Sequence, residues 1–262
     1  MPTTAVPPRR AWVEQIMGLP VSVHLRGPEV DGAEAELRVG ALFADLRRAD
    51  AVFSTYRAGS QLNQVARGEL DVAYADDVLA EVLALCEMAR MRTDGWFDVR
   101  RLPDPEGGPP RLDPSGLVKG WAIQLAARRL EQFTGHGWCL NAGGDVLVAT
   151  VPGHPPWRVG IEDPDNPSRL LRVVTVADGA VATSGNAHRG AHIVDPFTGR
   201  PAAKVRAVTV VGPSLLWADV YATAAAARGL GALHWIPTLE GYAALVVDRN
   251  GAVATTPDWP DR

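Results

Sequence analysis

The chain has 262 residues, of which 47% are hydrophobic and 21% are charged, and its formal net charge is −4. This composition is that of a folded globular protein, which excludes a disordered or fibrous chain. A small negative charge gives no field that would attract nucleic acid or anionic lipid, so neither is expected as a partner.

The N-terminal segment, residues 1–12, is expected to be disordered, because it carries three prolines and two arginines. It holds no apolar run of the length of a signal peptide or membrane helix, so no membrane anchor is expected. Cys86 and Cys139 are far apart and lack metal-ligand spacing. Both are interpreted as buried, reduced core residues, which is typical of a cytoplasmic protein.

In the first half of the chain, residues 13–25 predict a strand or hairpin, and residues 33–52 have apolar side chains at helical spacing. A second helix is predicted over residues 76–92, with acidic residues at its start and arginines at its end. Residues 100–114 are rich in proline and glycine and predict irregular structure. Within one domain covering residues 13–262, residues 100–112 are therefore the candidate flexible linker.

In the second half, residues 118–133 predict a third helix, and Ser214 and Gly229 are interpreted as the cap and stop of a fourth. The last hairpin is predicted around an Asn250-Gly251 turn. Strands are expected at four further segments: residues 138–150, 157–161, 170–176 and 206–211. Helices and strands mix without strict alternation, which favours an α+β fold with a largely antiparallel sheet packed against helices.

The segment Asn141 to Asp145 breaks an apolar strand with two glycines. Paired glycines mark either a close approach of backbone to a ligand or a tight hairpin turn. Taken alone, the segment does not choose between the two.

Asp219 and Thr223 stand four residues apart on a predicted helix, so their oxygens lie on one face and could share a hard cation such as Mg²⁺. The alternative is an acidic residue near a helix start and a threonine that bonds a backbone carbonyl. The surrounding residues are apolar. A partly buried aspartate of this kind needs a partner, and a metal ion is one.

Two further segments carry groups suited to chemistry. Asp113 to Gly120 places a Pro-Ser-Gly loop before a helix, so free N–H groups and Lys119 could face an anion, although a plain helix start explains the segment equally well. His188, Arg189 and His192 crowd one predicted loop, and histidine exchanges a proton near neutral pH. A lone histidine is more often structural.

Five segments occur in an order that resembles the FAD:protein FMN transferases, the ApbE family. They are Asp113 to Gly120, Asn141 to Asp145, Thr183 to Gly185, His192 to Pro196, and Ala218-Asp219 with Thr223. The resemblance implies an ApbE-like fold with an FAD cleft between sheet and helices. It also implies a Mg²⁺ site formed by Asp219, Thr223 and the carbonyl of Gly116.

The resemblance assigns catalytic roles to His192, as the base toward the acceptor hydroxyl, and to Lys119. It implies that FAD contacts Met17, Tyr56, Trp96, Phe97, Asp98, Asp113, Lys119, Asn141, Gly143, Gly144, Asp145, Ser184, Gly185 and Val194. For Tyr56, packing on the core is the alternative. The chain departs from some members at Ala222, where they carry a second acidic ligand.

The function so implied is the Mg²⁺-dependent transfer of FMN from FAD, as substrate, to a threonine or serine hydroxyl of an acceptor flavoprotein, with release of AMP. Two alternatives stand beside it. A Mg²⁺-dependent FAD pyrophosphatase would use water in place of the hydroxyl and yield FMN and AMP. A flavin-binding protein would carry out no chemistry.

Overall fold

The computed structural model describes residues 7–103, 108, 110–185 and 193–260. Within them, an eight-stranded sheet has the order β1-β2-β3-β4-β7-β10-β11-β12. Its paired neighbours run antiparallel. The strands are β1 (Arg9–Ile16), β2 (Leu19–Arg26), β3 (Gly137–Ala142), β4 (Asp145–Ala149), β7 (Gly179–Gly185), β10 (Val205–Gly212), β11 (Ala243–Asp248) and β12 (Val253–Thr255).

Two small antiparallel sheets accompany the large one, β5 (Trp157–Asp163) with β6 (Asn166–Val176) and β8 (Val194–Asp195) with β9 (Arg200–Pro201). The α-helices are α1 (Ala33–Phe53), α2 (Gln61–Ala66), α3 (Asp77–Arg92), α4 (Ser115–Glu131), α5 (Leu215–Arg228) and α6 (Ala232–Trp235). Single 3₁₀ turns occupy Val72–Tyr74, Gly229–Gly231 and Ile236–Thr238.

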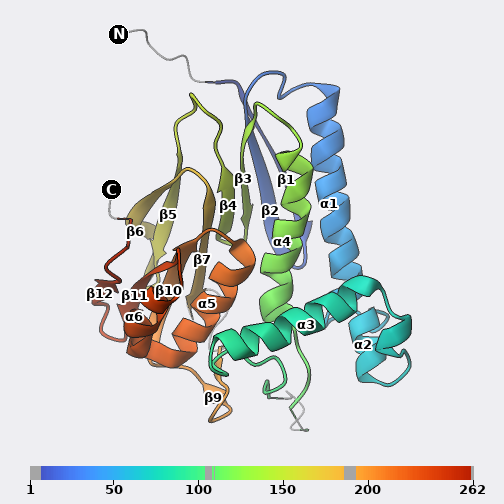
Figure 1. Cartoon of the computed structure of the whole chain (residues 1–262), viewed down its shortest axis with the longest axis vertical. Coiled ribbons are helices and arrows are strands. Elements are labelled where there is room, and N and C mark those ends of the chain that lie inside the picture. The colour runs from blue at the N-terminus through green and yellow to red at the C-terminus, as the bar shows by residue number, and fades with distance from the viewer. Residues whose placement is uncertain (1–6, 104–107, 109, 186–192, 261–262) are drawn as a thin grey trace.

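Both faces of the large sheet are covered (Figure 1), with α1, α4 and α5 over one and the β5–β6 hairpin over the other. Alternation along β2 shows how the sequence sets this up, because Val21, Val23 and Leu25 are buried toward the helices while the residues between them face the other way. The larger core lies between sheet and helices. A second core lies under the hairpin and includes Trp157 and Val174.

The sequence prediction of an antiparallel α+β fold is confirmed, with four corrections to individual elements. Residues 9–12 were expected to be disordered, and this expectation is wrong. They pair with β2, so β1 begins at Arg9. α4 begins at Ser115, earlier than residue 118, and the Ser115 N–H donates to Asp113 Oδ1 just before the helix. The strand expected over residues 138–150 is a hairpin, and the central strand β7 was not predicted.

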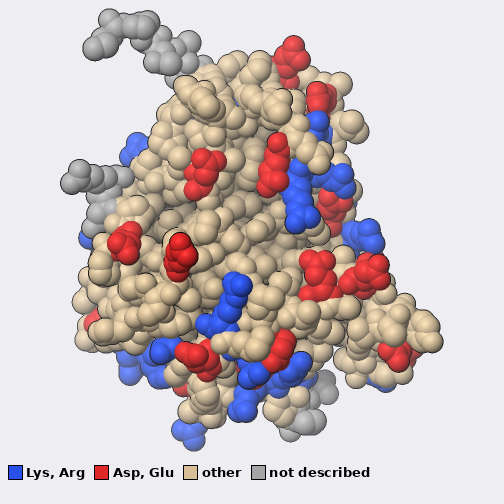
Figure 2. Space-filling view, viewed as in Figure 1, with Lys and Arg blue, Asp and Glu red and all other residues tan. Residues whose placement is uncertain are grey.

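On the face shown in Figure 2, acidic and basic side chains are interspersed, as the small net charge suggests. No helix in the described part of the chain has the length and apolar character needed to cross a bilayer.

Candidate active site

Three segments distant in sequence bring two carboxylates onto one ammonium group. Lys119 on α4 forms an ion pair with Asp145 at the start of β4, and its Nζ lies 3.5 Å from Oδ2 of Asp219 on α5. The side chains of Asp145 and Asp219 are only 1% and 4% exposed. Buried charges of this kind need compensation, and two carboxylates share one cation here.

The glycine pair between β3 and β4 places Asp145. Gly143 and Gly144 have φ angles of 60° and 98°, which favour glycine, and they form the two-residue turn of the hairpin. Asn141 closes this turn, since its Oδ1 accepts a hydrogen bond from the Gly144 N–H at 3.0 Å. Asp145 follows directly, and its Oδ1 accepts from the Thr183 N–H on β7 at 3.1 Å. The segment is therefore a tight hairpin turn, and its predicted contact with FAD stays a prediction.

Gly120 lets α4 approach α5 closely enough to join Lys119 and Asp219. A Cβ atom at this position would lie 3.1 Å from the Leu215 carbonyl oxygen and 3.3 Å from the Asp219 Cβ. Any larger residue would push the helices apart. The fit of these two helices is thus a condition for the site.

Hydroxyl groups flank the carboxylates. Thr223 lies one turn after Asp219, and its Oγ1 is 2.9 Å from Oγ of Ser184 at the end of β7. The Asp219 and Thr223 oxygens are hard donors of the kind that Mg²⁺ prefers, so this donor set fits the ion. No group of three His, Cys, Asp or Glu residues suited to a metal occurs among the described residues.

Gly116, predicted to offer a carbonyl, lies in the first turn of α4, the helix that also carries Lys119. The ring of Phe97 packs against it, since a Cβ atom there would be 3.4 Å from the Phe97 Cε2. Phe97 is buried. This contact fixes the start of α4 beside the segment that follows α3.

A second cluster lies where that segment meets β8, β9 and the end of α5. The Trp96 ring packs edge-to-face on Phe197 at 4.8 Å, and Lys204 Nζ lies 4.7 Å from the ring centroid. Lys204 also donates to Asp195 at 3.1 Å and to the Ala227 carbonyl at 3.2 Å. These contacts join four chain segments, which carry Trp96, Asp195 with Phe197, Lys204 and Ala227.

The Asp195 carboxyl is held in its charged form. Burial by itself would raise its pKa, but the hydrogen bonds from Lys204 and from the Phe197 N–H outweigh burial and lower the pKa below its usual value. Neither Asp195 nor Lys204 was singled out as a site residue from the sequence. The signal that could have found Lys204 is compositional, because lysine occurs only twice in the chain.

Other predicted FAD contacts are spread around these clusters. Met17 lies in the β1–β2 turn with φ 55°, and Val194 lies in β8 beside Asp195. At Gly185 a Cβ atom would lie 2.6 Å from the Arg206 carbonyl oxygen, so glycine is needed for the pairing of β7 with β10. Tyr56 is 98% exposed, so its alternative interpretation as a core residue is wrong.

Two predicted acidic contacts hold local backbone. Asp113 Oδ1 accepts from the Ser115 N–H at 2.9 Å, at the start of α4, while Asp98 Oδ1 accepts from the Arg100 N–H at 3.0 Å. His192, with His188 and Arg189, lies outside the described residues. Its proposed role stays a prediction.

Comparisons with known proteins agree on one family. The profile of the ApbE family matches residues 105–246. A protein named FAD:protein FMN transferase from Vibrio cholerae is 33% identical over 123 residues, which is 43% of this chain and 37% of that protein. One of the same name from Rhodobacter capsulatus is 32% identical over 161 residues, which is 58% of this chain and 31% of that protein.

Among solved structures, the ApbE protein of Thermotoga maritima superposes with a TM-score of 0.84 at 21% identity, covering 97% of this chain and all of that one. The flavinyl transferase ApbE of Pseudomonas stutzeri, in its apo form, gives 0.79 at 23% identity, covering 96% of each. These likenesses establish the fold. The aligned part of the chain spans well under half the length of the curated relatives it matches.

Proposed function

This chain belongs to the ApbE family, and we propose that it transfers FMN from FAD to a threonine or serine hydroxyl of an acceptor flavoprotein. The hydroxyl oxygen bonds to the phosphorus of the FMN half of FAD. The bond from that phosphorus to the bridging oxygen breaks, and AMP leaves. The support is the family membership together with the name that the curated relatives carry.

The observation that carries the proposal is the buried pair of carboxylates, Asp145 and Asp219, around one ammonium group. This cluster is a charged, largely water-excluded site in which phosphoryl transfer depends on positioning and charge neutralisation. We assign Lys119 to the phosphate oxygens of FAD. Its ammonium group is a compact charge on a flexible stem, which suits a shift from carboxylate to phosphate.

Asp219 and Thr223, with the Gly116 carbonyl, are the residues that would hold Mg²⁺. When bound, the ion supplies charge neutralisation at the diphosphate. The hydrogen bond between Thr223 and Ser184 keeps the two hydroxyls beside Asp219. Asp145 holds Lys119 in place until the substrate phosphates compete for it.

We assign the hydroxyl proton to His192, the histidine of the His-Ile-Val-Asp-Pro segment. Asp195, three residues later, is fixed by Lys204, which anchors the end of that segment. Trp96, whose ring is held by Phe197 and Lys204, is the proposed platform for part of FAD. A positioned base contributes about 10²–10⁴-fold to the rate.

The test is to incubate the protein with FAD, Mg²⁺ and an acceptor flavoprotein domain, and to weigh the acceptor by mass spectrometry. Transfer predicts that the acceptor gains one FMN while AMP is released in equal amount. Release of FMN and AMP without a gain in acceptor mass would make the protein an FAD pyrophosphatase. Intact FAD that stays bound would make it a flavin-binding protein.

A further inference from the structure

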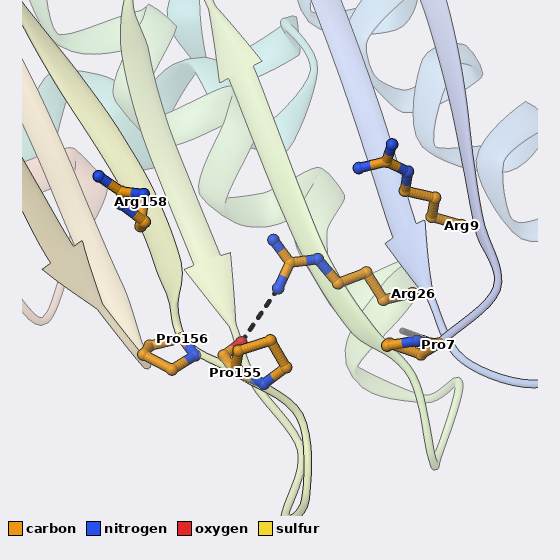
Figure 3. A pocket seen from close by; sticks show the side chains of 6 residues that line it. All are labelled: Pro7, Arg9, Arg26, Pro155, Pro156 and Arg158. Atoms are coloured by element: carbon orange, nitrogen blue, oxygen red, sulfur yellow. Dashed lines mark hydrogen bonds between the residues drawn. The ribbon is translucent and has the colours of Figure 1, made fainter. Parts of the chain in front are cut away.

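A hollow of about 290 Å³ lies at the end of the sheet opposite the candidate active site. Arg26 pairs with Gly137 at one end of β2 and β3, whereas the Gly143-Gly144 turn lies at their other end. The separation along β2 is roughly 17 Å, at about 3.3 Å a residue. The lining residues, shown in Figure 3, are Pro7, Arg9, Arg26, Pro155, Pro156 and Arg158.

The central guanidinium, that of Arg26, is held in place before any ligand binds. Its Nη1 donates to the Pro155 carbonyl at 3.0 Å, and its Cζ lies 3.3 Å from the centroid of the Trp157 ring. That ring is fixed in turn, because its Nε1 donates to the Ala149 carbonyl at 3.1 Å. A stacked guanidinium keeps its remaining N–H groups oriented for an anion.

The three arginines of this hollow, Arg9, Arg26 and Arg158, form no ion pair with a carboxylate of the described residues, whereas the adjacent Arg10 pairs with Glu36 and Asp31. Burial, and to a smaller extent the charge of Arg9, lower the pKa of Arg26. Gathering like charges in this way costs stability, and an anion would recover it.

We propose that these three arginines form a binding site for a phosphate group, distinct from the candidate active site. Arg9, Arg26 and Arg158 come from three strands, and Figure 3 shows Arg26 lying between the other two. Several guanidinium forks match a tetrahedral oxyanion, which offers several acceptor oxygens. The volume suits a small molecule rather than an element of another protein, and rigid proline walls bound it.

The test follows the arginine Nε–Hε signals of ¹⁵N-labelled protein while inorganic phosphate is added at constant ionic strength. EDTA is present so that no divalent ion recruits phosphate to the candidate active site. The expected result is saturable shifts of the Arg26 signal. Arg26→Met should weaken phosphate binding by about tenfold or more, the loss of a charged hydrogen-bond donor.

Arg9→Met and Arg158→Met address the rim without touching the Trp157 stack, and each should weaken binding several-fold. Arg172→Met is the matched control, because Arg172 also forms no ion pair among the described residues but lies on β6 outside the hollow. AMP is titrated in parallel, so that binding of a phosphate ester can be told from binding of a free phosphate ion. No saturable shift with either probe, or equal weakening in the control variant, would overturn the proposal.

Discussion

Lysine occupies only two positions of this chain, against 24 arginines, and each lysine pairs with a nearly buried aspartate. Lys119 lies between two carboxylates. Lys204 contacts one carboxylate, one backbone carbonyl and one aromatic ring. Among the described residues, the first cluster therefore places two buried carboxylates around one ammonium group, whereas the second pairs one carboxylate with one ammonium group. This difference indicates that the first is built for incoming ions, and that the second holds chain segments together.

Asp219→Asn is the strongest test of the difference between the two lysine clusters. It keeps the shape of the side chain but removes the negative charge of Asp219, so flavin transfer should fall by about 10²–10³-fold, the usual loss of a preorganised charge. The rate of gain in acceptor mass measures this. Asp163→Asn is the matched control, because Asp163 is also nearly buried and ion-paired, with Arg169, but lies on β5. Equal losses in both variants would contradict the assignment.

Lys119→Met should have the largest effect on stability, because it leaves Asp145 and Asp219 without their shared cation. The free energy of unfolding should fall by about 3 kcal/mol, as when one partner of a buried ion pair is removed. Adding Asp145→Asn to this variant should restore part of the loss. A double-mutant cycle by urea denaturation measures the coupling, and a coupling energy near zero would show that the pair contributes nothing.

Gly120→Ala tests whether the site needs the close contact of α4 with α5. The new methyl group would sit 3.1 Å from backbone atoms of Leu215 and Leu216, which belong to a rigid helix. Overpacking of this kind costs about 2 kcal/mol, and it should lower activity as well by moving Lys119 away from Asp219. Gly40→Ala in α1 is the control. It meets nothing within 4 Å and should stabilise the protein by about 0.5–1 kcal/mol.

Local signals in the sequence were enough to predict much of the fold. Helical spacing placed Asp219 and Thr223 on one face of α5, and the Ser214 cap and the Asn250-Gly251 turn lie where expected. Such features depend on neighbours a few residues away. β7 was missed, because its small residues have weak strand propensity and only its place between β4 and β10 makes it a strand.

The resemblance names residues for the candidate site, whereas their arrangement comes only from the structure. The resemblance assigns Lys119 and Asp145 separately to FAD, and their ion pair depends on the packing of α4 over the sheet, which no local pattern encodes. The same holds for Lys204, whose partners Asp195 and Ala227 come from β8 and α5. The tertiary packing of the helices on the sheet determines which charged side chains form ion pairs.

The smallest expected effect belongs to the Lys204 cluster. Lys204→Met should lower the free energy of unfolding by about 1 kcal/mol at neutral pH, since the Lys204 side chain is 47% exposed and its ion pair is partly screened. Because the pKa of Asp195 is lowered in the folded protein, this stabilisation is present above about pH 4, the unfolded value. It disappears as the pH falls through the lower folded value and the carboxylate takes up a proton.

The stability curves of wild type and Lys204→Met should therefore converge in acid and separate above about pH 4, as followed by urea denaturation across pH. Arg206→Met supplies the control two residues further along the chain, because its partner Asp165 is 51% exposed and the ion pair should contribute less. Parallel curves for wild type and Lys204→Met would mean that Asp195 does not depend on this lysine. Since Lys204 also contacts Trp96, FAD affinity should weaken in the Lys204→Met variant, while turnover at saturating FAD should change little. This pattern is that of a positioning residue, and it differs from the chemical role assigned to Lys119.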